Sequence, residues 1–250
     1  MRTPILAANW KMHKTTGEAE AFVDQFLPLV ADAVADIVLA PTATALHCLG
    51  KALAGSNVAL SAQNVNPEPK GAFTGELSAA MLVDVGCQYT IVGHSERRSL
   101  YGETSEFVAH KAAALLASGI RPIICVGETI EEREADQVET IIGGQLAGSL
   151  ATVETTQVGE IVVAYEPVWA IGTGKTATPE LAQDVHRFIR GQLCDRFGDA
   201  GETIRIQYGG SVKPDNVAEL MAQPDIDGGL VGGASLDPAS FASIVQFDRG

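Results

Sequence analysis

The sequence predicts an α/β protein built on parallel β-strands. Short apolar runs alternate with longer segments of helical spacing, and polar residues follow the ends of several runs. Strands that alternate with helices pair in parallel and are joined by right-handed crossovers. Eight such units fit a closed (β/α)8 barrel with eight parallel strands, and 250 residues is an ordinary length for that fold. An open doubly wound sheet has the same periodicity, so it stays an alternative on these observations.

Strands are predicted where apolar, β-branched residues run without interruption, because strands of a parallel sheet are buried on both faces. The predicted strands cover residues 5–8, 37–40, 58–61, 89–92, 122–126, 161–165, 204–208 and 229–231. The clearest helical spacing covers residues 18–34, 106–117, 137–150 and 179–197. Thr178 followed by Pro179 is typical of a helix start, and Gly119 of a helix end. No composition break marks a linker, so residues 1–250 are expected to form one domain.

Composition and charge exclude several classes of partner. The formal net charge of −14 argues against nucleic acid and against an anionic membrane surface. A phosphorylated substrate would therefore need local donors, which outweigh distant charges because salt screens charges beyond roughly 8 Å. Cys87 and Cys125 adjoin or lie in apolar runs and are expected to be buried thiols, as in a reducing cytosol. Without metal-ligand spacing, a signal core or a membrane span, we expect a cytoplasmic protein.

Polar residues and glycines gather just past the C-terminal ends of the predicted strands. In a parallel barrel these ends face one mouth, where active sites of this fold are built. Residues far apart in the sequence therefore become neighbours around one pocket. The residues concerned are Asn9 and Lys11, His94 and Glu96, Glu166, residues 209–211, and Gly232 with Gly233.

The most informative segment begins at the strand that ends beside Glu166. Pro167 follows at once; it fixes its own φ and biases Glu166 toward extended geometry. Residues 169–171 would give the next loop an apolar underside, and Gly172 allows its backbone to approach a ligand closely. A positioned carboxylate beneath a water-excluding lid indicates proton transfer on a small molecule. The alternative is a surface glutamate before an ordinary strand-to-helix loop.

Five motifs, in order along the chain, resemble the signatures of the triosephosphate isomerase family. They are NWK at 9–11, GHSERR at 93–98, AYEPVWAIGTGK at 164–175, YGGS at 208–211 and LVGGASL at 230–236. The resemblance covers essentially the whole chain and favours the closed barrel. It implies an aldose–ketose isomerase of glycolysis and gluconeogenesis that interconverts dihydroxyacetone phosphate and D-glyceraldehyde 3-phosphate through an enediolate. It also implies that neither a metal nor an organic cofactor is needed.

The resemblance assigns a role to each residue at the mouth. Glu166 is the expected general base. His94, expected at the start of a short helix whose N–H groups disfavour positive charge, polarises the carbonyl as a neutral imidazole and relays a proton. Lys11 stabilises negative charge and Asn9 orients the substrate oxygens. Glu96 is expected to position Lys11; from the sequence, an ion pair with one of the arginines at 97 and 98 stays an alternative.

The same resemblance predicts a phosphate site and a lid. Backbone N–H groups at glycine turns bind anions without a charged side chain, and Gly172, Ser211, Gly232 and Gly233 are expected to hold the phosphate. Residues 167–169 and 175–177 are the expected hinges of a lid whose five intervening residues move together. Such a lid keeps water from the enediolate and disfavours loss of its phosphate.

The loop at residues 63–76 resembles the segment that inserts into a second subunit in dimers of this family. Thr74 would reach the region of the partner's Met12, so a homodimer is expected. Two rival functions stay open: a phosphosugar aldolase that uses Lys11 as a Schiff base, and a barrel that binds phosphate ligands without turnover. The presence of Asn9, Lys11, His94 and Glu166 together argues against the second.

Overall fold

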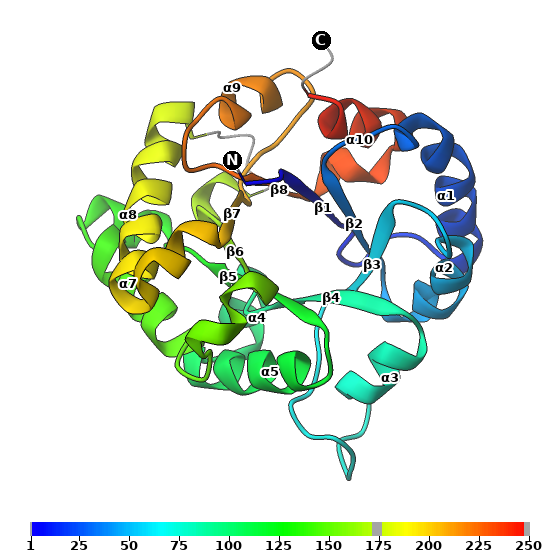
Figure 1. The fold of residues 1–250 in the computed structure, drawn as a ribbon, viewed down its shortest axis with the longest axis horizontal. Helices are drawn as coiled ribbons and strands as arrows, with labels where there is room; N and C mark the ends of the chain where they lie inside the picture. The colour runs from blue at the N-terminus through cyan, green and yellow to red at the C-terminus, as the bar shows by residue number, and fades with distance from the viewer. Residues whose placement is uncertain (1, 172–176, 248–250) are drawn as a thin grey trace.

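The computed structural model describes residues 2–171 and 177–247, which contain a closed barrel of eight parallel strands (Figure 1). Each strand pairs with its neighbours in sequence, and β1 also pairs with β8 to close the ring. The strands are β1 (Ile5–Asn9), β2 (Asp36–Ala40), β3 (Val58–Ala62), β4 (Cys87–Val92), β5 (Arg121–Val126), β6 (Val162–Tyr165), β7 (Arg205–Tyr208) and β8 (Gly228–Val231). The predicted barrel is confirmed, and the open sheet is wrong.

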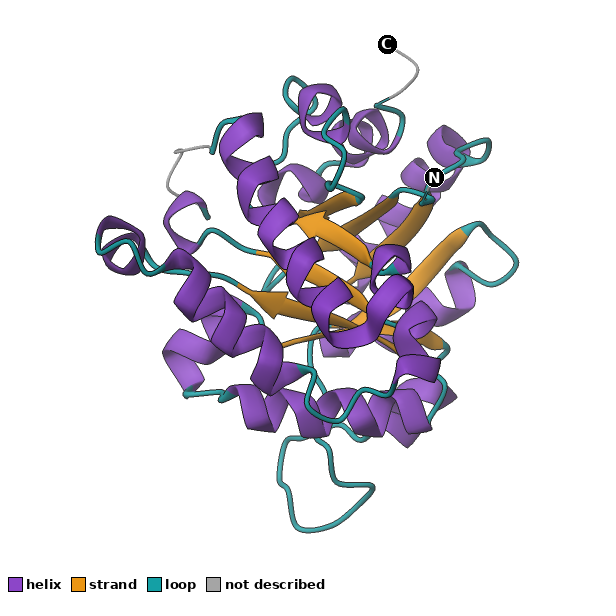
Figure 2. Ribbon diagram, turned by 60° about the vertical axis from the view of Figure 1, so that its left-hand side comes forward, coloured by secondary structure: helices purple, strands orange, loops and turns teal. Residues whose placement is uncertain are grey.

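Helices connect successive strands and surround the barrel (Figure 2). They are α1 (Thr16–Val30), α2 (Leu46–Ala52), α3 (Ala79–Asp84), α4 (Ser95–Tyr101), α5 (Ser105–Ala117), α6 (Ile130–Glu134), α7 (Val138–Ser149), α8 (Pro179–Phe197), α9 (Val217–Met221) and α10 (Pro238–Val245). The predicted signals hold: the Thr178 hydroxyl accepts a hydrogen bond from the Leu181 N–H at 3.2 Å, and Gly119 has a φ of 75°. The first helix ends four residues before its predicted end.

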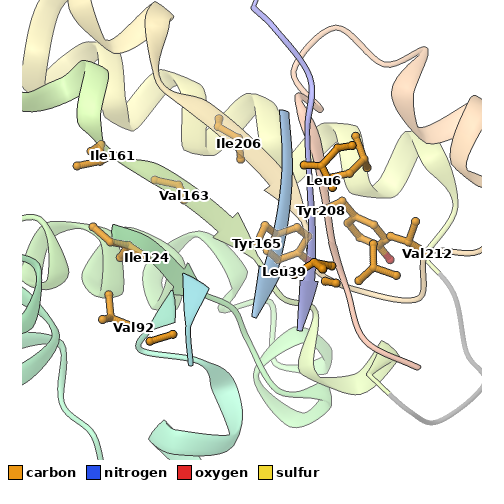
Figure 3. Packing of buried hydrophobic residues seen from close by; sticks show 14 of the residues in the cluster. Leu6, Leu39, Val92, Ile124, Ile161, Val163, Tyr165, Ile206, Tyr208 and Val212 are labelled. Atoms are coloured by element: carbon orange, nitrogen blue, oxygen red, sulfur yellow. The ribbon is translucent and has the colours of Figure 1, made fainter. Parts of the chain in front are cut away.

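Successive residues of each strand point alternately into the barrel and outward to the helices. Ile5 and Ala7 belong to the inner apolar cluster, whereas Leu6 belongs to the larger cluster beneath the helices. Figure 3 shows part of this outer layer, with Tyr165 from β6 among its members. Each fully buried Leu or Ile side chain contributes roughly 1.5–3 kcal/mol, so both layers stabilise the barrel. The alternation also directs Glu166, which directly follows Tyr165, into the mouth.

Gly93 is a turn where the backbone requires glycine. It directly follows β4 and has a φ of 68°, in the left-handed region that favours glycine. A Cβ there would lie 2.9 Å from both the Arg98 Nη2 atom and a methyl carbon of Val108. The turn leads directly from β4 into α4, so His94 becomes the N-cap of that helix.

The cysteines and the helices bear on the expected environment of the protein. Cys87 and Cys125 are buried as predicted, and all four cysteines are free thiols. Burial raises the pKa of the Cys87 thiol to about 12. Across residues 2–171 and 177–247, no helix combines the length and the apolar character that crossing a membrane would require.

Candidate active site

A cavity of about 430 Å³ opens at the C-terminal ends of the strands. The predicted residues that line it are Asn9, Lys11, His94, Glu166, Ser211, Gly232 and Gly233. Glu96 lines an adjoining cavity of about 390 Å³, which it shares with Lys11 and His94. Gly172 lies outside the described residues, as do the middle of the predicted lid and most of its second hinge. The fold therefore brings together the described residues that the sequence placed at the mouth.

Glu166 is buried, with 2% of its surface exposed, and both carboxylate oxygens have partners. The Oε1 atom lies 2.8 Å from His94 Nε2, and Oε2 accepts the Ser95 N–H at 2.9 Å. Burial raises the pKa of Glu166, but His94, the Ser95 N–H and Lys11 together hold it below its ordinary value. The carboxylate is therefore ionised in this arrangement.

His94 is held in one orientation by the helix that it caps. Its Nδ1 atom accepts the Glu96 N–H at 3.2 Å, so the ring proton belongs on Nε2, which donates to Glu166. Burial lowers the pKa of His94, whereas the carboxylates of Glu166 and Glu96 raise it, and it lies above the ordinary value while Glu166 is in contact. Because the Glu96 N–H occupies the lone pair that a second proton would need, we assign the neutral ring.

Lys11 adopts an unusual backbone conformation, with a φ of 51°. A left-handed conformation costs a residue other than glycine roughly 1–2 kcal/mol, so its surroundings must hold it there. The Asn9 side chain accepts the Lys11 N–H at 3.1 Å, and the Gln63 amide donates to the Lys11 carbonyl at 2.9 Å. The Lys11 ammonium then reaches the Glu96 carboxylate at 2.7 Å.

Among the described residues, Glu96 thus contacts Lys11, the partner that the resemblance implied, and neither neighbouring arginine forms an ion pair with it. Arg97 pairs with Glu103 at 2.5 Å, and Arg98 turns inward to backbone carbonyls and serine hydroxyls. The sequence left both choices open because all three charged residues lie within one helical turn. The direction in which each side chain leaves the helix decides the pairing.

The glycines after β7 are required by close contacts. A Cβ on Gly209 would lie 2.8 Å from the Glu166 side chain, and one on Gly210 would lie 2.2 Å from the Tyr208 hydroxyl. Ser211 follows, and its carbonyl accepts the Asn216 side-chain amide at 2.9 Å. With only hydrogen at these positions, the backbone N–H groups can border the cavity closely.

Two basic side chains at this cavity were not predicted. His13 and Lys213 line it beside Gly232 and Gly233. The His13 Nδ1 atom lies 2.9 Å from the Trp10 carbonyl. Neither residue directly follows a predicted strand, so the rule that located the other residues at the mouth did not select them. Together with Lys11, they bring basic groups to the mouth of a chain whose net charge is −14.

Glu128 is a further functional candidate that the sequence analysis missed. It is fully buried, and its Oε1 atom accepts three donors: Arg133 Nε at 2.8 Å, the Tyr165 hydroxyl at 3.1 Å and Trp169 Nε1 at 2.9 Å. Trp169 was expected to give the loop an apolar underside and to belong to its first hinge, and its indole N–H is in addition bonded to a buried carboxylate. The position of Glu128, two residues past β5, was the signal that could have found it.

The amino-acid sequence is similar to those of known proteins. A protein-family model described as triosephosphate isomerase matches residues 4–248. A curated triosephosphate isomerase of Moorella thermoacetica is 55% identical over 249 residues, covering 100% of each chain. That of Pelobacter propionicus is 55% identical over 99% of each chain. That of Chloroflexus aurantiacus is 52% identical over 99% of this chain and 100% of the relative.

Proposed function

This chain belongs to the triosephosphate isomerase family and is an isomerase, and we propose that Glu166 and His94 perform its reaction. The reaction interconverts dihydroxyacetone phosphate and D-glyceraldehyde 3-phosphate through an enediolate. The observation that carries the proposal is the 2.8 Å contact between the two side chains at the mouth of the barrel. A base beside a hydrogen-bond donor is what enolisation next to a carbonyl needs.

Glu166 takes the proton from the substrate carbon after it leaves its present partners. The electron pair of the broken C–H bond then forms the carbon–carbon double bond, and the carbonyl oxygen becomes negative. Leaving His94 and the Ser95 N–H removes two influences that lower the pKa of Glu166, while burial continues to raise it. The carboxylate therefore becomes a stronger base where it meets the substrate.

The same movement prepares His94 as the electrophile. Once Glu166 withdraws, the carboxylate that most raises the pKa of His94 is gone, and burial favours the neutral ring. Its Nε2–H then donates to the substrate oxygen that gains charge. After that proton passes to the oxygen, the ring accepts one from the neighbouring hydroxyl. Glu166 returns its proton to the adjacent carbon, so the two substrates interconvert without net oxidation.

Lys11 and Asn9 stabilise the charge that develops on the substrate oxygens. The Lys11 ammonium makes a 2.7 Å ion pair with Glu96, which fixes its direction. A cation held in a fixed direction stabilises a developing oxyanion more than a mobile surface lysine would. Glu96 is thus proposed to position Lys11 and, through its backbone N–H, to hold the His94 ring.

Phosphate is proposed to bind at the end of the cavity formed after β7 and β8. Ser211, Gly232 and Gly233 border that end, and their backbone N–H groups suit an anion. Gly172 is proposed to add a further N–H when the lid closes. The first hinge, 167–169, is anchored through Trp169 to Glu128, which supports a lid that moves about a fixed hinge.

The homodimer is a further part of the proposal. The segment between β3 and α3 extends away from the barrel (Figure 1), and residues 71–76 on it, Thr74 included, are exposed. Met12 is 92% exposed and Tyr101 70% exposed, and both line the adjoining cavity of about 390 Å³. Exposed apolar side chains beside a cavity support a contact with a second copy. Sedimentation at micromolar concentration should give twice the chain mass; a single-chain mass would contradict this.

We also propose that the protein is cytoplasmic and that residues 1–250 act as one domain. The four free thiols support a reducing compartment. The aldolase alternative is wrong, because the family of this chain is that of an isomerase. The Lys11 amine also lies in an ion pair, and a charged ammonium is a poor nucleophile for a Schiff base.

The Glu166→Gln variant tests the proposed base. The amide keeps the size of the side chain but cannot accept the carbon proton, so turnover should fall by about 10²–10⁴-fold. Binding of inorganic phosphate, measured by calorimetry, should stay within a few-fold of the native value. Glu139→Gln, on the exposed side of α7, is the matched control. A near-native rate for Glu166→Gln would remove Glu166 from its role.

A further inference from the structure

At the barrel mouth, β5 continues beyond the point where its neighbour β4 turns away. The paired residues run from Tyr89 with Arg121 to Val92 with Ile124. Gly93 then turns the chain into α4, while β5 goes on through Cys125 and Val126. In a strand, alternate residues direct their N–H and C=O groups to the same neighbour. The backbone groups of Cys125 and Gly127 therefore face a side where β4 has ended.

Two side chains take over the hydrogen bonds that β4 no longer makes. Arg98 Nη2 donates to the Cys125 carbonyl at 3.1 Å. Gln145, on α7, bonds both backbone groups of Gly127. The Gln145 side-chain oxygen accepts the Gly127 N–H at 2.8 Å, and the side-chain nitrogen donates to the Gly127 carbonyl at 3.0 Å. These contacts continue the hydrogen-bonding pattern of the sheet by two residues without a strand.

The backbone of residues 126–127, held in this way, is in contact with the backbone of Glu166. The Glu166 N–H donates to the Val126 carbonyl at 2.8 Å. A Cβ on Gly127 would lie only 1.8 Å from the Glu166 carbonyl oxygen, so the two backbones are in direct contact. A shift of residues 126–127 would therefore shift the backbone of Glu166 as well.

Apart from these side-chain contacts, the space that β4 has left beside residues 126–127 is open. A cavity of about 220 Å³ lies between α4 and the end of β5, lined by Arg98, Gly127, Gln145 and Glu166 among others. A space of this size can hold several water molecules but does not support the strand mechanically. Arg98 is also bonded to the Gly93 carbonyl and to two serine hydroxyls, whereas the contacts of Gln145 are with Gly127. Gln145 is therefore the more selective position to perturb.

We propose that Gln145 is a positioning residue for the reaction, which replaces the missing strand at Gly127 and thereby fixes the backbone of Glu166. The proposal rests on Glu166 being the general base. Gln145 borders the cavity behind Glu166 and is absent from the lining of the proposed substrate cavity. Its loss should therefore affect the chemical step and spare the binding of phosphate.

The Gln145→Met variant is the test. Methionine keeps the length of the side chain and removes both hydrogen bonds, which water in the adjoining cavity can replace without the same geometry. Because a base misplaced by about 1 Å costs on the order of 10²-fold in rate, kcat should fall at least 10-fold. KM and the inhibition constant of inorganic phosphate should stay within about 2-fold.

Gln183→Met is the matched control, because Gln183 likewise uses both ends of its amide to contact a single residue elsewhere in the fold. Its amide nitrogen donates to the Asp225 carboxylate at 2.6 Å, and its oxygen accepts the Asp225 N–H at 3.1 Å. This control should lose stability but keep kcat within about 2-fold. If Gln145→Met is not obtained folded, Gln145→Glu keeps the acceptor for the Gly127 N–H and removes the donor; it too should lower kcat several-fold.

Native kcat in the folded Gln145→Met variant would overturn the proposal. Equal losses of kcat in the Gln145 and Gln183 variants, or a parallel loss of phosphate affinity, would show a general structural effect and overturn it too. The failure of this proposal and the failure of the proposed role of Glu166 give different results. If Glu166→Gln is inactive and Gln145→Met is normal, only the positioning role fails; an active Glu166→Gln would remove the base itself.

Discussion

His186 should make the stability of the protein fall steeply in mild acid. It lies on α8 with no exposed surface, and its Nδ1 atom faces the Asp225 carbonyl at 3.1 Å. Its Nε2 atom has no hydrogen-bond partner among the described residues, and the rings of Tyr165 and Tyr208 pack beside it. Burial lowers the pKa of His186 to about 4, despite the opposing effect of Asp225. A second proton would place a charged N–H in an apolar site.

The magnitude follows from the difference between the folded and unfolded pKa values. In the unfolded chain a histidine has a pKa of about 6.5. As the pH falls below that value, the unfolded state binds a proton that the folded state does not, so the free energy of unfolding decreases. The difference of about 2.5 between the two pKa values corresponds to roughly 3–4 kcal/mol in the free energy of unfolding, of which about 3 kcal/mol is lost by pH 4. Between pH 7.5 and pH 5 the expected loss is about 2 kcal/mol.

Urea unfolding at pH 7.5 and pH 5, at one fixed protein concentration, measures this loss. The His186→Gln variant retains a donor for the Asp225 carbonyl but has no titrating ring. It should be less stable than the native protein at pH 7.5, yet it should lose about 2 kcal/mol less on acidification. His110→Gln, at an exposed position of α5, should keep the native pH dependence. Equal losses in the native protein and His186→Gln would refute the reasoning.

Two further predictions concern buried carboxylates. Glu128→Gln presents an amide to three donors and leaves the Arg133 charge without its partner, so the free energy of unfolding should fall by about 3 kcal/mol. Acrylamide should also quench the fluorescence of Trp169 more strongly, because its bond to the carboxylate is weakened. Unchanged quenching would contradict the role of Glu128 in holding Trp169. Asp227→Asn weakens contacts at 2.6 Å with Arg2 and 2.7 Å with Arg190. Because Asp227 precedes β8, at the end opposite the mouth, stability in urea should fall by about 3 kcal/mol while kcat stays native; a lower kcat would contradict this separation.

The strands could be predicted from the sequence because each is buried on both faces and therefore uninterrupted in its apolar character. The largest difference at any strand boundary is two residues, at the start of β4. Closure into a barrel could not be predicted from periodicity, because it depends on the pairing of β1 with β8 across more than 200 residues. The family resemblance supplied that step. The extent of the domain and the homodimer stay predictions.

Much of the site could be predicted because parallel strands deliver their C-terminal ends to one place. That rule found Asn9, His94 and Glu166 without knowledge of their contacts. It missed Gln145, because this residue lies in the middle of a helix and acts on a backbone 18 positions away. It missed the polar anchor of Trp169 for the same reason: the partner, Glu128, is 41 positions away. Contacts between distant side chains leave no periodic trace in the sequence.

Glu128 and Glu166 show why position alone does not make a carboxylate a base. Both follow adjacent strands of the barrel and both are buried. Glu128 is bonded to Arg133, so its departure would leave a half-buried guanidinium without its counter-charge, which is costly. The contacts of Glu166 are with a ring that we assign as neutral and with the backbone N–H of Ser95. When Glu166 moves, no cation in direct contact loses its partner, and the His94 N–H becomes free to donate to the substrate. Glu166 can therefore reach the reacting carbon, whereas Glu128 stays in place and holds the lid hinge.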